Sequence, residues 1–146
     1  MANRILAFGT VLEYSTDDGT TWKPVAGLSN VDTPSGTTEE VDGTGHDSPG
    51  GYRELIPGLK DAGEVSLEGF YDPNDESHDG AAGLPYLWGT GDVVAWRVRS
   101  PAHGVTSGVG LAGYVSAFQA TFPVDGLMGF TATIRASGPT TFPAAA

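Results

Sequence analysis

An all-β fold with one short helix is the architecture that the sequence predicts. Its 146 residues include 22 glycines and 10 prolines, which favour turns. Threonine, valine and aromatic residues, which favour strands, are also frequent. Several segments alternate apolar and polar side chains, as expected for strands with one buried face. A chain of this length can bury its own core, so we expect a single domain over residues 1–146.

The chain begins with a predicted β-hairpin. Residues 10–15 and 21–25 have the composition of strands, and the Asp18-Gly19 pair between them is a strong turn signal. Trp22, directly after this turn, is expected to anchor the core or an interface. Pro24 indicates an edge strand or a strand end, because proline cannot donate a backbone hydrogen bond. A further short strand is predicted over residues 28–33.

The segment over residues 35–51 is acidic and glycine-rich, and it shows neither a helical nor a strand period. Structureless connections longer than about 12 to 15 residues are uncommon in compact domains and are usually functional or disordered. Its composition buries too little apolar surface to fold alone. We therefore predict a long loop that acts as a contact arm and becomes ordered against a neighbouring subunit.

Strict alternation begins at residue 64 and predicts a strand over residues 64–71. Successive side chains of a strand point to opposite faces, so only one face of this strand is suited to the core. One face presents Val65, Leu67, Gly69 and Tyr71, and the other presents Glu64, Ser66, Glu68 and Phe70.

A short helix is predicted over residues 81–88, after a polar cluster with helix-capping residues and before Gly89. Pro85 fits near the beginning of this helix or at a kink. Leu84, Leu87 and Trp88 lie at spacings of three and four. They form one apolar stripe, which we expect to cover a face of the sheet.

The C-terminal third of the chain predicts three more strands. Residues 93–99 alternate, and residues 111–122 and 129–136 are longer alternating segments that should pair as a second hairpin. Residues 100–110 are predicted to be a turn-rich linker. Residues 139–146 are expected to form a flexible, extended tail.

Three patterns that resemble ligand sites are each better explained without a ligand. Gly108–Gly113 matches G-x-G-x-x-G, but the residues that follow alternate as a strand, whereas dinucleotide binding requires a helix there. Residues 72–76 resemble the start of a calcium loop, which then lacks its glycine and its bidentate glutamate. His46, His78 and His103 lie far apart in polar loops, so we expect them to be exposed and predict no metal site.

No pattern in the sequence indicates an enzyme. No serine lies in a G-x-S-x-G turn, and no pair of carboxylates lies in apolar surroundings that would separate their pKa values. The chain has no cysteine, which excludes disulfides and thiolate ligands. We predict no catalytic residue and no cofactor.

The charge of the chain is strongly acidic, with 18 acidic and 7 basic residues and a net charge of −11. Affinity for nucleic acid comes from lysine and arginine neutralising phosphates, so this charge argues against direct binding of the phosphate backbone. Solubility is an equally good explanation of the charge. No segment approaches the roughly 18 apolar residues of a membrane span, and no signal peptide is recognisable, so we expect no membrane partner.

Six parts of the sequence together carry a family pattern. They are G-T-x-L-x-Y-S at residues 9–15, Trp22 after a turn, the runs at 38–42 and 50–65, Y-D-P at 71–73, and F-x-A-T-I-R-A-S-G at 130–138. In this order they resemble the major tail tube proteins of long-tailed, non-contractile bacteriophages. The resemblance covers most of the chain, but it includes no catalytic signature.

The resemblance implies a β-sandwich or partly closed barrel with one flanking helix. It further implies a structural virion protein that polymerises into hexameric rings, which stack into a tail tube through which DNA reaches the host. The long loop would bridge subunits and successive rings. The residues assigned to this inter-subunit contact are Thr38, Glu39, Glu40, Val41, Asp42, Tyr52 and Arg53. Some members of the family add a C-terminal immunoglobulin-like domain, which we do not expect here.

The same resemblance implies where the protein acts and what it meets. It would be assembled in the host cytoplasm into the virion tail, in contact with further copies of itself and with the tape measure, terminator and tail tip proteins. DNA would pass through the lumen without specific binding. Glu64 and Glu68 are candidates for the lumen wall because they share one strand face, although an ordinary solvated outer face is an equal alternative.

Two other functions stay open at this point. A stand-alone β-sandwich binding module of the carbohydrate or adhesin type would explain exposed tryptophan and tyrosine residues. Another ring-forming tail component, such as a tail terminator, would form rings without elongating them. Self-association separates these alternatives, because a binding module should stay monomeric whereas a tube subunit should assemble without a ligand.

Overall fold

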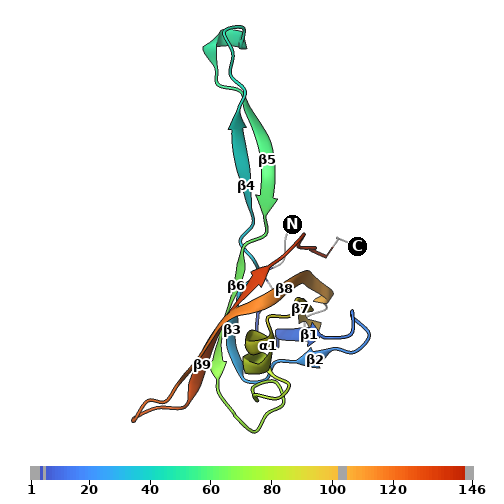
Figure 1. Cartoon of the computed structure of the whole chain (residues 1–146), viewed down its shortest axis with the longest axis vertical. Coiled ribbons are helices and arrows are strands. Elements are labelled where there is room, and N and C mark those ends of the chain that lie inside the picture. Colours follow the sequence, from blue (N-terminus) through green and yellow to red (C-terminus); the bar gives the residue numbers. More distant parts are fainter. Residues whose placement is uncertain (1–3, 5, 102–104, 144–146) are drawn as a thin grey trace.

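The computed structural model describes residues 4, 6–101 and 105–143. It consists of a β-rich body from which one long hairpin projects (Figure 1). The elements are β1 (Val11–Ser15), β2 (Lys23–Pro24), β3 (Leu28–Val31), β4 (Thr37–Asp42), the 3-10 helix η1 (Pro49–Gly51), β5 (Leu55–Asp61), β6 (Glu64–Phe70), α1 (Leu84–Thr90), β7 (Val94–Ser100), β8 (Val105–Thr121) and β9 (Gly129–Ala136).

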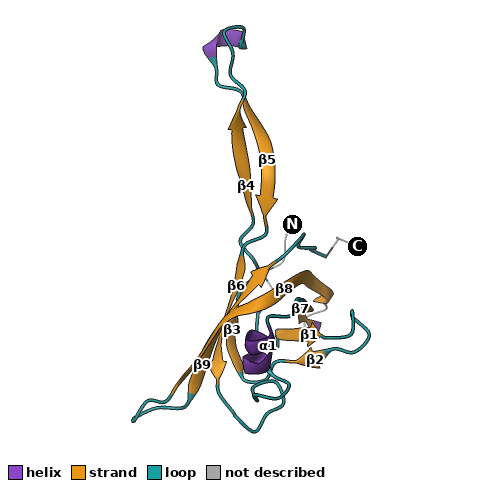
Figure 2. Ribbon diagram, in the orientation of Figure 1, coloured by secondary structure: helices purple, strands orange, loops and turns teal. Residues whose placement is uncertain are grey.

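The body is built on one antiparallel sheet of seven strands in the order β2-β1-β7-β8-β9-β6-β3. β4 and β5 pair only with each other and form the projecting hairpin (Figure 2). The first hairpin is confirmed as β1 and β2, and the second as β8 and β9. The turn of the first hairpin uses Asp18 and Gly19, both with positive φ, as the Asp-Gly signal predicted.

β8 is the strand that folds the sheet back on itself. Its first half pairs with β7 and its second half with β9, and Gly113 pairs with both Val94 and Ala136. A Cβ atom at Gly113 would lie 2.5 Å from the carbonyl oxygen of Arg135, so only glycine permits this approach of the two backbones. The G-x-G-x-x-G match therefore lies inside a strand, where its small residues serve packing.

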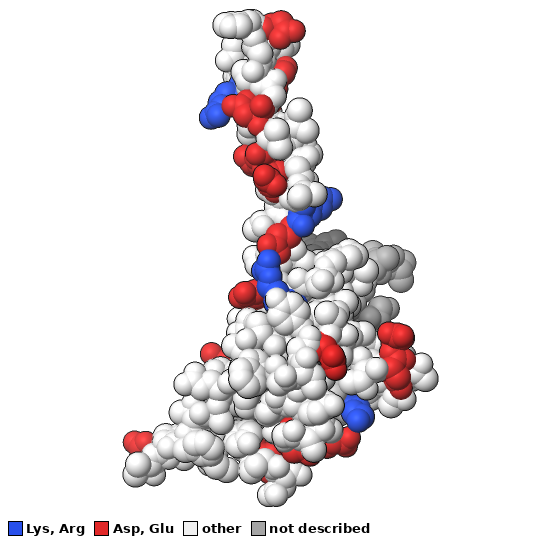
Figure 3. All heavy atoms as spheres, viewed as in Figure 1, with Lys and Arg blue, Asp and Glu red and all other residues white. Residues whose placement is uncertain are grey.

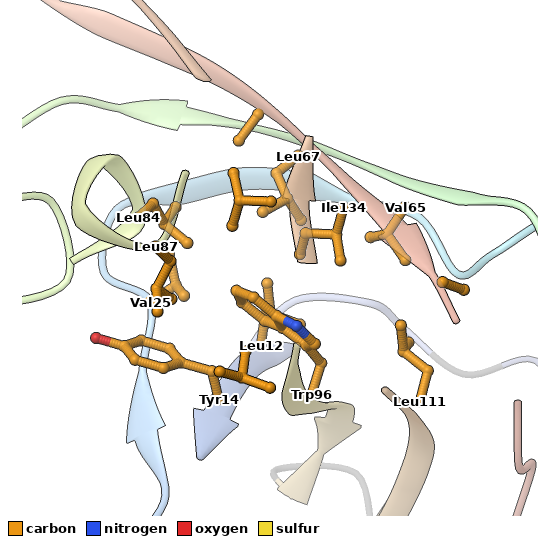
Figure 4. Packing of buried hydrophobic residues seen from close by; sticks show 14 of the residues in the cluster. Leu12, Tyr14, Val25, Val65, Leu67, Leu84, Leu87, Trp96, Leu111 and Ile134 are labelled. Carbon is orange, nitrogen blue, oxygen red and sulfur yellow. The ribbon is translucent and has the colours of Figure 1, made fainter. Parts of the chain in front are cut away.

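The core lies between the two halves of the folded sheet, and α1 covers one side of it (Figure 4). Tyr14 and Trp96 form its largest aromatic pair, with ring centroids 5.5 Å apart. Burial, and then the charges of nearby acidic residues, raise the pKa of the Tyr14 phenol to about 12. Each fully buried apolar side chain contributes roughly 1.5–3 kcal/mol. The central members are Leu12, Tyr14, Val65, Leu67, Leu84, Leu87, Trp96, Phe130 and Ile134.

The helix α1 begins at Leu84 and ends at Thr90, three residues later at its start than the sequence predicts and past Gly89. Pro85 lies in its first turn, and Gly91 ends it with a φ of 71°. Leu84 and Leu87 are buried, but Trp88 is 56% exposed, so the predicted three-residue stripe is wrong at its last member. A helix of only two turns presents little more than one pair of residues to the sheet.

The prediction of a linker over residues 100–110 is wrong for the second half of this segment, because β8 already begins at Val105. Val109 pairs with Val98, and Val105 pairs with Ser100 across an irregularity in the register. Gly108, with a φ of 68°, lies in this irregular stretch. The sequence prediction therefore missed a strand with a bulge, because this segment is rich in glycine and serine.

The structureless loop predicted over residues 35–51 is also wrong. Thr37–Asp42 is strand β4, which pairs with β5 across the turn that contains η1. Every residue of both strands is exposed, so neither face selects apolar side chains and the sequence shows no strict alternation. We call residues 37–61 the arm.

The tail predicted to be flexible over residues 139–146 is partly anchored. The backbone of Thr141 forms two hydrogen bonds with Gly110, of 2.8 and 2.9 Å, and extends the sheet by one bridge. Residues 144–146 lie outside the described part of the chain.

Candidate functional site

The arm carries all seven residues that the sequence assigned to the inter-subunit contact. Thr38 to Asp42 lie on β4, whereas Tyr52 and Arg53 lie at the far end beside η1 (Figure 1). Arg53 and Asp42 form an ion pair of 3.0 Å across the hairpin. Hydrogen bonds from Thr44, and then from Arg53, hold the pKa of Asp42 below its usual value. These contacts link the two strands at the end of the arm.

One face of the arm carries three exposed apolar side chains, next to Glu39. Val41 pairs with Ile56, and paired residues of antiparallel strands share a face. A bulge places Gly58 and Leu59 together opposite Glu39. Val41, Ile56 and Leu59 are 49%, 56% and 81% exposed. This apolar arm face has no cover from the described residues.

A second surface covers the outer side of β3, β6, β9 and the second half of β8. Most of its side chains are polar or acidic, and Glu64 and Glu68 both belong to it. Two exposed aromatic residues also lie on this surface: Phe70, on the predicted face of Glu64 and Glu68, and Tyr114, which pairs with Arg135. Cross-strand pairing brings them together with the polar side chains of the neighbouring strands. We call this surface the polar sheet face: Asn30, Glu64, Ser66, Glu68, Gln119, Thr121, Thr131, Thr133 and Arg135.

Arg135 is the only cation of the polar sheet face, and its charge is neutralised. Its Nη2 atom lies 2.6 Å from the Oδ2 atom of Asp61 at the base of the arm. The hydrogen bond from Arg135, and then that from the Gly63 backbone, lower the pKa of Asp61. The ion pair thus ties the arm to the sheet and leaves the face with the acidic character of Glu64 and Glu68.

The opposite part of the sheet buries a carboxylate between two arginines. Glu13 accepts hydrogen bonds from Arg97, at 3.0 Å, and from Arg99. Burial raises the pKa of Glu13, but the hydrogen bonds from Arg99 and Arg97 outweigh it and hold the pKa below its usual value. Trp22, expected to anchor the core or an interface, is half-buried and lies under Arg97, whose Cζ atom is 4.2 Å from the ring. It packs outside the core.

His78 does not belong to an exposed loop, contrary to the sequence prediction. It is 1% exposed, and its Nε2–H donates to the carbonyl of Ala26 at 2.8 Å. Its Nδ1 accepts from the backbone N–H of Asp72 at 3.0 Å, which fixes the neutral tautomer. His46 is exposed as predicted, and His103 lies outside the described residues.

The acidic loop around His78 binds its own backbone. The carboxylates of Asp72, Asp75 and Asp79 accept hydrogen bonds from backbone N–H groups two or three residues further on. The hydrogen bond from the Ser77 hydroxyl, and then that from the Ser77 backbone, lower the pKa of Asp75. The backbone N–H groups of Ala82 and Ala81 lower the pKa of Asp79. No group of three or more histidine and acidic side chains within residues 4–101 and 105–143 is placed to hold a metal ion. No helix in the described parts of the chain is long and apolar enough to span a membrane.

The turn between β8 and β9 carries exposed residues that the sequence prediction did not assign to any site. They are apolar although they occupy a turn, which is the signal that could have identified them. We call this set the hairpin-tip patch: Phe122, Val124, Leu127 and Met128.

The chain matches one protein family over nearly its whole length. The sequence pattern described as lambda phage tail tube protein, TTP, matches residues 9–143. No curated protein matches the sequence.

Several solved structures share the fold. The tail of an empty gene transfer agent particle, computed with C6 symmetry, is similar with a TM-score of 0.76 and 20% identity, covering 97% of this chain and 100% of that chain. The SPP1 tail tube is similar with a TM-score of 0.70 and 11% identity, covering 92% and 77%. A sheath-tube complex of an extracellular contractile injection system has a TM-score of 0.60 and 8% identity, covering 94% and 90%.

The family match and the folded antiparallel sheet with its single short helix agree with the resemblance found in the sequence. The similar structures confirm the fold. The chain belongs to the lambda phage tail tube protein family and is a structural component of the virion tail.

Proposed function

We propose that six copies of this chain form each ring of a tail tube, and that the rings stack around a channel through which DNA passes into the host. The similarity to a gene transfer agent tail of C6 symmetry supports six copies. The observation that carries the assembly is the arm, whose two strands project from the body and are exposed along their whole length (Figure 1).

The arm needs a partner to be stable in its projecting conformation. An isolated two-stranded hairpin is marginally stable in water, and the arm's strands pair with no other strand of the described chain. The apolar arm face would bury Val41, Ile56 and Leu59 if a neighbouring copy covered it. We assign the contact to this face together with Thr38, Glu39, Glu40, Asp42, Tyr52 and Arg53.

The polar sheet face is suited to line the channel. Duplex DNA presents a dense row of phosphates, and unpaired lysine or arginine side chains would bind it in every ring. Here the only cation of the face is held by Asp61, whereas Glu64 and Glu68 are exposed. A wall of this kind repels DNA weakly from all sides, so the genome meets no deep binding site during transit.

We also propose the remaining partners, which the resemblance in the sequence implied. A tail tube would contact the tape measure protein inside it, a terminator at one end and tail tip proteins at the other. Figure 3 shows acidic side chains along the arm and scattered over the body, with fewer basic ones. This distribution agrees with partners that bind through shape and apolar contacts rather than through phosphate groups.

Removal of the arm end tests the assembly. Deletion of residues 43–50 keeps the paired strands β4 and β5, and we expect a folded monomer that cannot form tubes in negative-stain electron microscopy. Ile56→Asp should have the same effect because it places a charge on the apolar arm face. Val93→Asp is the control, since Val93 is equally exposed, at 57% against 56%, but lies away from the arm. Normal tubes from the deletion variant would exclude the arm as the contact.

A further inference from the structure

The hairpin-tip patch is a convex apolar surface with a single charge. Phe122, Val124 and Leu127 are largely exposed, and the ring of Phe122 meets the ring of Tyr71 edge to face, with centroids 6.0 Å apart. Asp125 is the one charged residue between residues 122 and 128. Its carboxylate makes no hydrogen bond or ion pair with any described residue. Exposed apolar side chains grouped on a projecting turn indicate an interaction surface.

A groove of about 930 Å³ lies at the base of the arm. Three segments form its walls: the base of the two arm strands, the residues just before the arm, and the anchored C-terminal segment. Its lining includes several apolar side chains. The residues relevant here are Pro34, Thr38, Lys60, Ala62, Pro139 and Phe142. We call it the arm-base groove.

Lys60 gives the arm-base groove an unpaired positive charge. The other cation of the arm, Arg53, forms an ion pair with Asp42. Asp61, next to Lys60 in the chain, forms its ion pair with Arg135 instead. The ammonium of Lys60 forms no ion pair or hydrogen bond with the part of the chain that the structure describes. A concave groove with a free cation therefore faces solvent in a protein whose net charge is −11.

The two surfaces are complementary but cannot meet within one copy. Figure 1 shows the turn between β8 and β9 pointing away from the arm, at the other end of the body from it. A convex patch and a concave groove on different parts of one molecule join copies head to tail, and such heterologous contacts propagate into rings or filaments. Opposite charges at the two centres fix the orientation of the contact.

We propose that the hairpin-tip patch of one copy inserts into the arm-base groove of a second copy, with the Asp125 carboxylate against the Lys60 ammonium. This contact rests on the proposed tube function and names one of the surfaces through which the tube is built.

Charge exchange tests the contact. Lys60→Glu and Asp125→Lys each place like charges together at the contact. We expect the binding free energy of the contact to fall by about 1.4 kcal/mol or more, which raises the critical concentration for tube formation at least about tenfold. The double variant Lys60→Glu/Asp125→Lys restores the pair in reverse and should return the critical concentration to within about twofold of the natural protein. Both residues are exposed, so each variant should keep the circular dichroism spectrum of the folded chain.

A matched control separates the contact from the net charge. Lys60→Glu/Asp92→Lys has the same net charge as the restored double variant, because each combines one loss and one gain of a positive residue. Asp92 is exposed and distant in sequence from both surfaces. This variant should stay defective, and Asp92→Lys alone should assemble normally. Equal rescue by both double variants would overturn the proposal, as would normal assembly of Lys60→Glu or of Asp125→Lys, or failure of the restored pair to assemble.

Disulfide formation gives an independent readout, since the natural chain has no cysteine. In oxidised tubes of Thr38→Cys/Val124→Cys we expect cross-linked chains on a denaturing gel, and none in Val93→Cys/Val124→Cys. Tubes without the first cross-link would overturn the docking and leave the tube function standing. If the natural protein forms no tubes at any concentration, the tube function itself fails, and this contact fails with it.

Discussion

The indole N–H of Trp96 donates a hydrogen bond of 3.0 Å to the carbonyl of Gly113, at the residue where β8 leaves β7 and joins β9. The largest core side chain is thereby fixed to the point at which the sheet folds. Every surface assigned to assembly is positioned by this fold. The polar sheet face lies on the half of the sheet formed by the second half of β8, β9, β6 and β3, and the hairpin-tip patch lies in the turn between β8 and β9. The cluster of Glu13, Arg97 and Arg99 lies on the other half, on β1 and β7.

Gly113→Ala should destabilise the protein strongly. The new Cβ atom would lie 2.5 Å from the Arg135 carbonyl oxygen, and a backbone atom in a paired strand cannot move aside as a flexible side chain can. We expect a loss of at least about 2 kcal/mol in the free energy of unfolding, measured by urea titration with tryptophan fluorescence. Gly89→Ala is the control: a Cβ atom there meets no atom within 4 Å, so it should stabilise α1 by about 0.5–1 kcal/mol.

His78→Ala should cost about 3 kcal/mol of stability, because it removes a buried ring and leaves two buried backbone groups without a partner. The ring packs against Phe130, with centroids 4.7 Å apart, and joins the backbones of Ala26 and Asp72. The exposed His46 provides the control, since His46→Ala should change the unfolding free energy by less than about 0.5 kcal/mol. Equal effects of the two substitutions on urea unfolding would contradict the assigned role of His78.

Stability should decline in acid partly through Asp17. Hydrogen bonds from Ser15, and then from Thr21, lower the pKa of Asp17 to about 2 from an ordinary value of 3.8. A lowered folded pKa gives stability that is complete above pH 3.8 and is lost as the pH falls toward 2. Asp17→Asn should therefore reduce stability at pH 6 and flatten its fall between pH 4 and pH 2. Asp32→Asn is the control and should leave the stability at pH 6 unchanged, because the Asp32 carboxylate makes no hydrogen bond to the described residues.

How far the sequence predicted the fold depended on whether a strand has one buried face. The alternation around Val65 and Leu67 identified β6 because one of its faces forms the core. The same reasoning missed β4, whose residues are exposed on both faces, and the start of β8, where Gly108 interrupts the pattern. These segments are strands because their backbones pair with neighbouring strands. Backbone pairing selects few particular residue types, so the composition does not reveal it.

The candidate site was predicted only in part for a similar reason. The arm residues were found through a family pattern, and their position on one projecting hairpin agrees with that assignment. The burial of His78 could not be predicted, because its two partners include Ala26, which lies 52 residues earlier in the chain. The ion pair of Arg135 with Asp61 spans 74 residues and is equally invisible in local sequence.

Charge reversal on the polar sheet face should make the channel bind DNA. Tubes of Glu64→Lys/Glu68→Lys protein should retain duplex DNA and slow its ejection at low salt, and both effects should recover as the salt concentration rises. Glu76→Lys/Asp92→Lys makes the same change of net charge on exposed residues outside this face. If both double variants assemble and eject DNA at the natural rate, Glu64 and Glu68 lie elsewhere than on the channel wall.

Cryo-electron microscopy of the purified protein at high concentration tests most directly whether it builds a tail tube. We predict hollow tubes of stacked rings with six copies in each ring, the arm of every copy in contact with a neighbour, and the polar sheet face turned to the channel. A protein that stays monomeric at every concentration, or one that closes single rings without elongating them, would contradict the account.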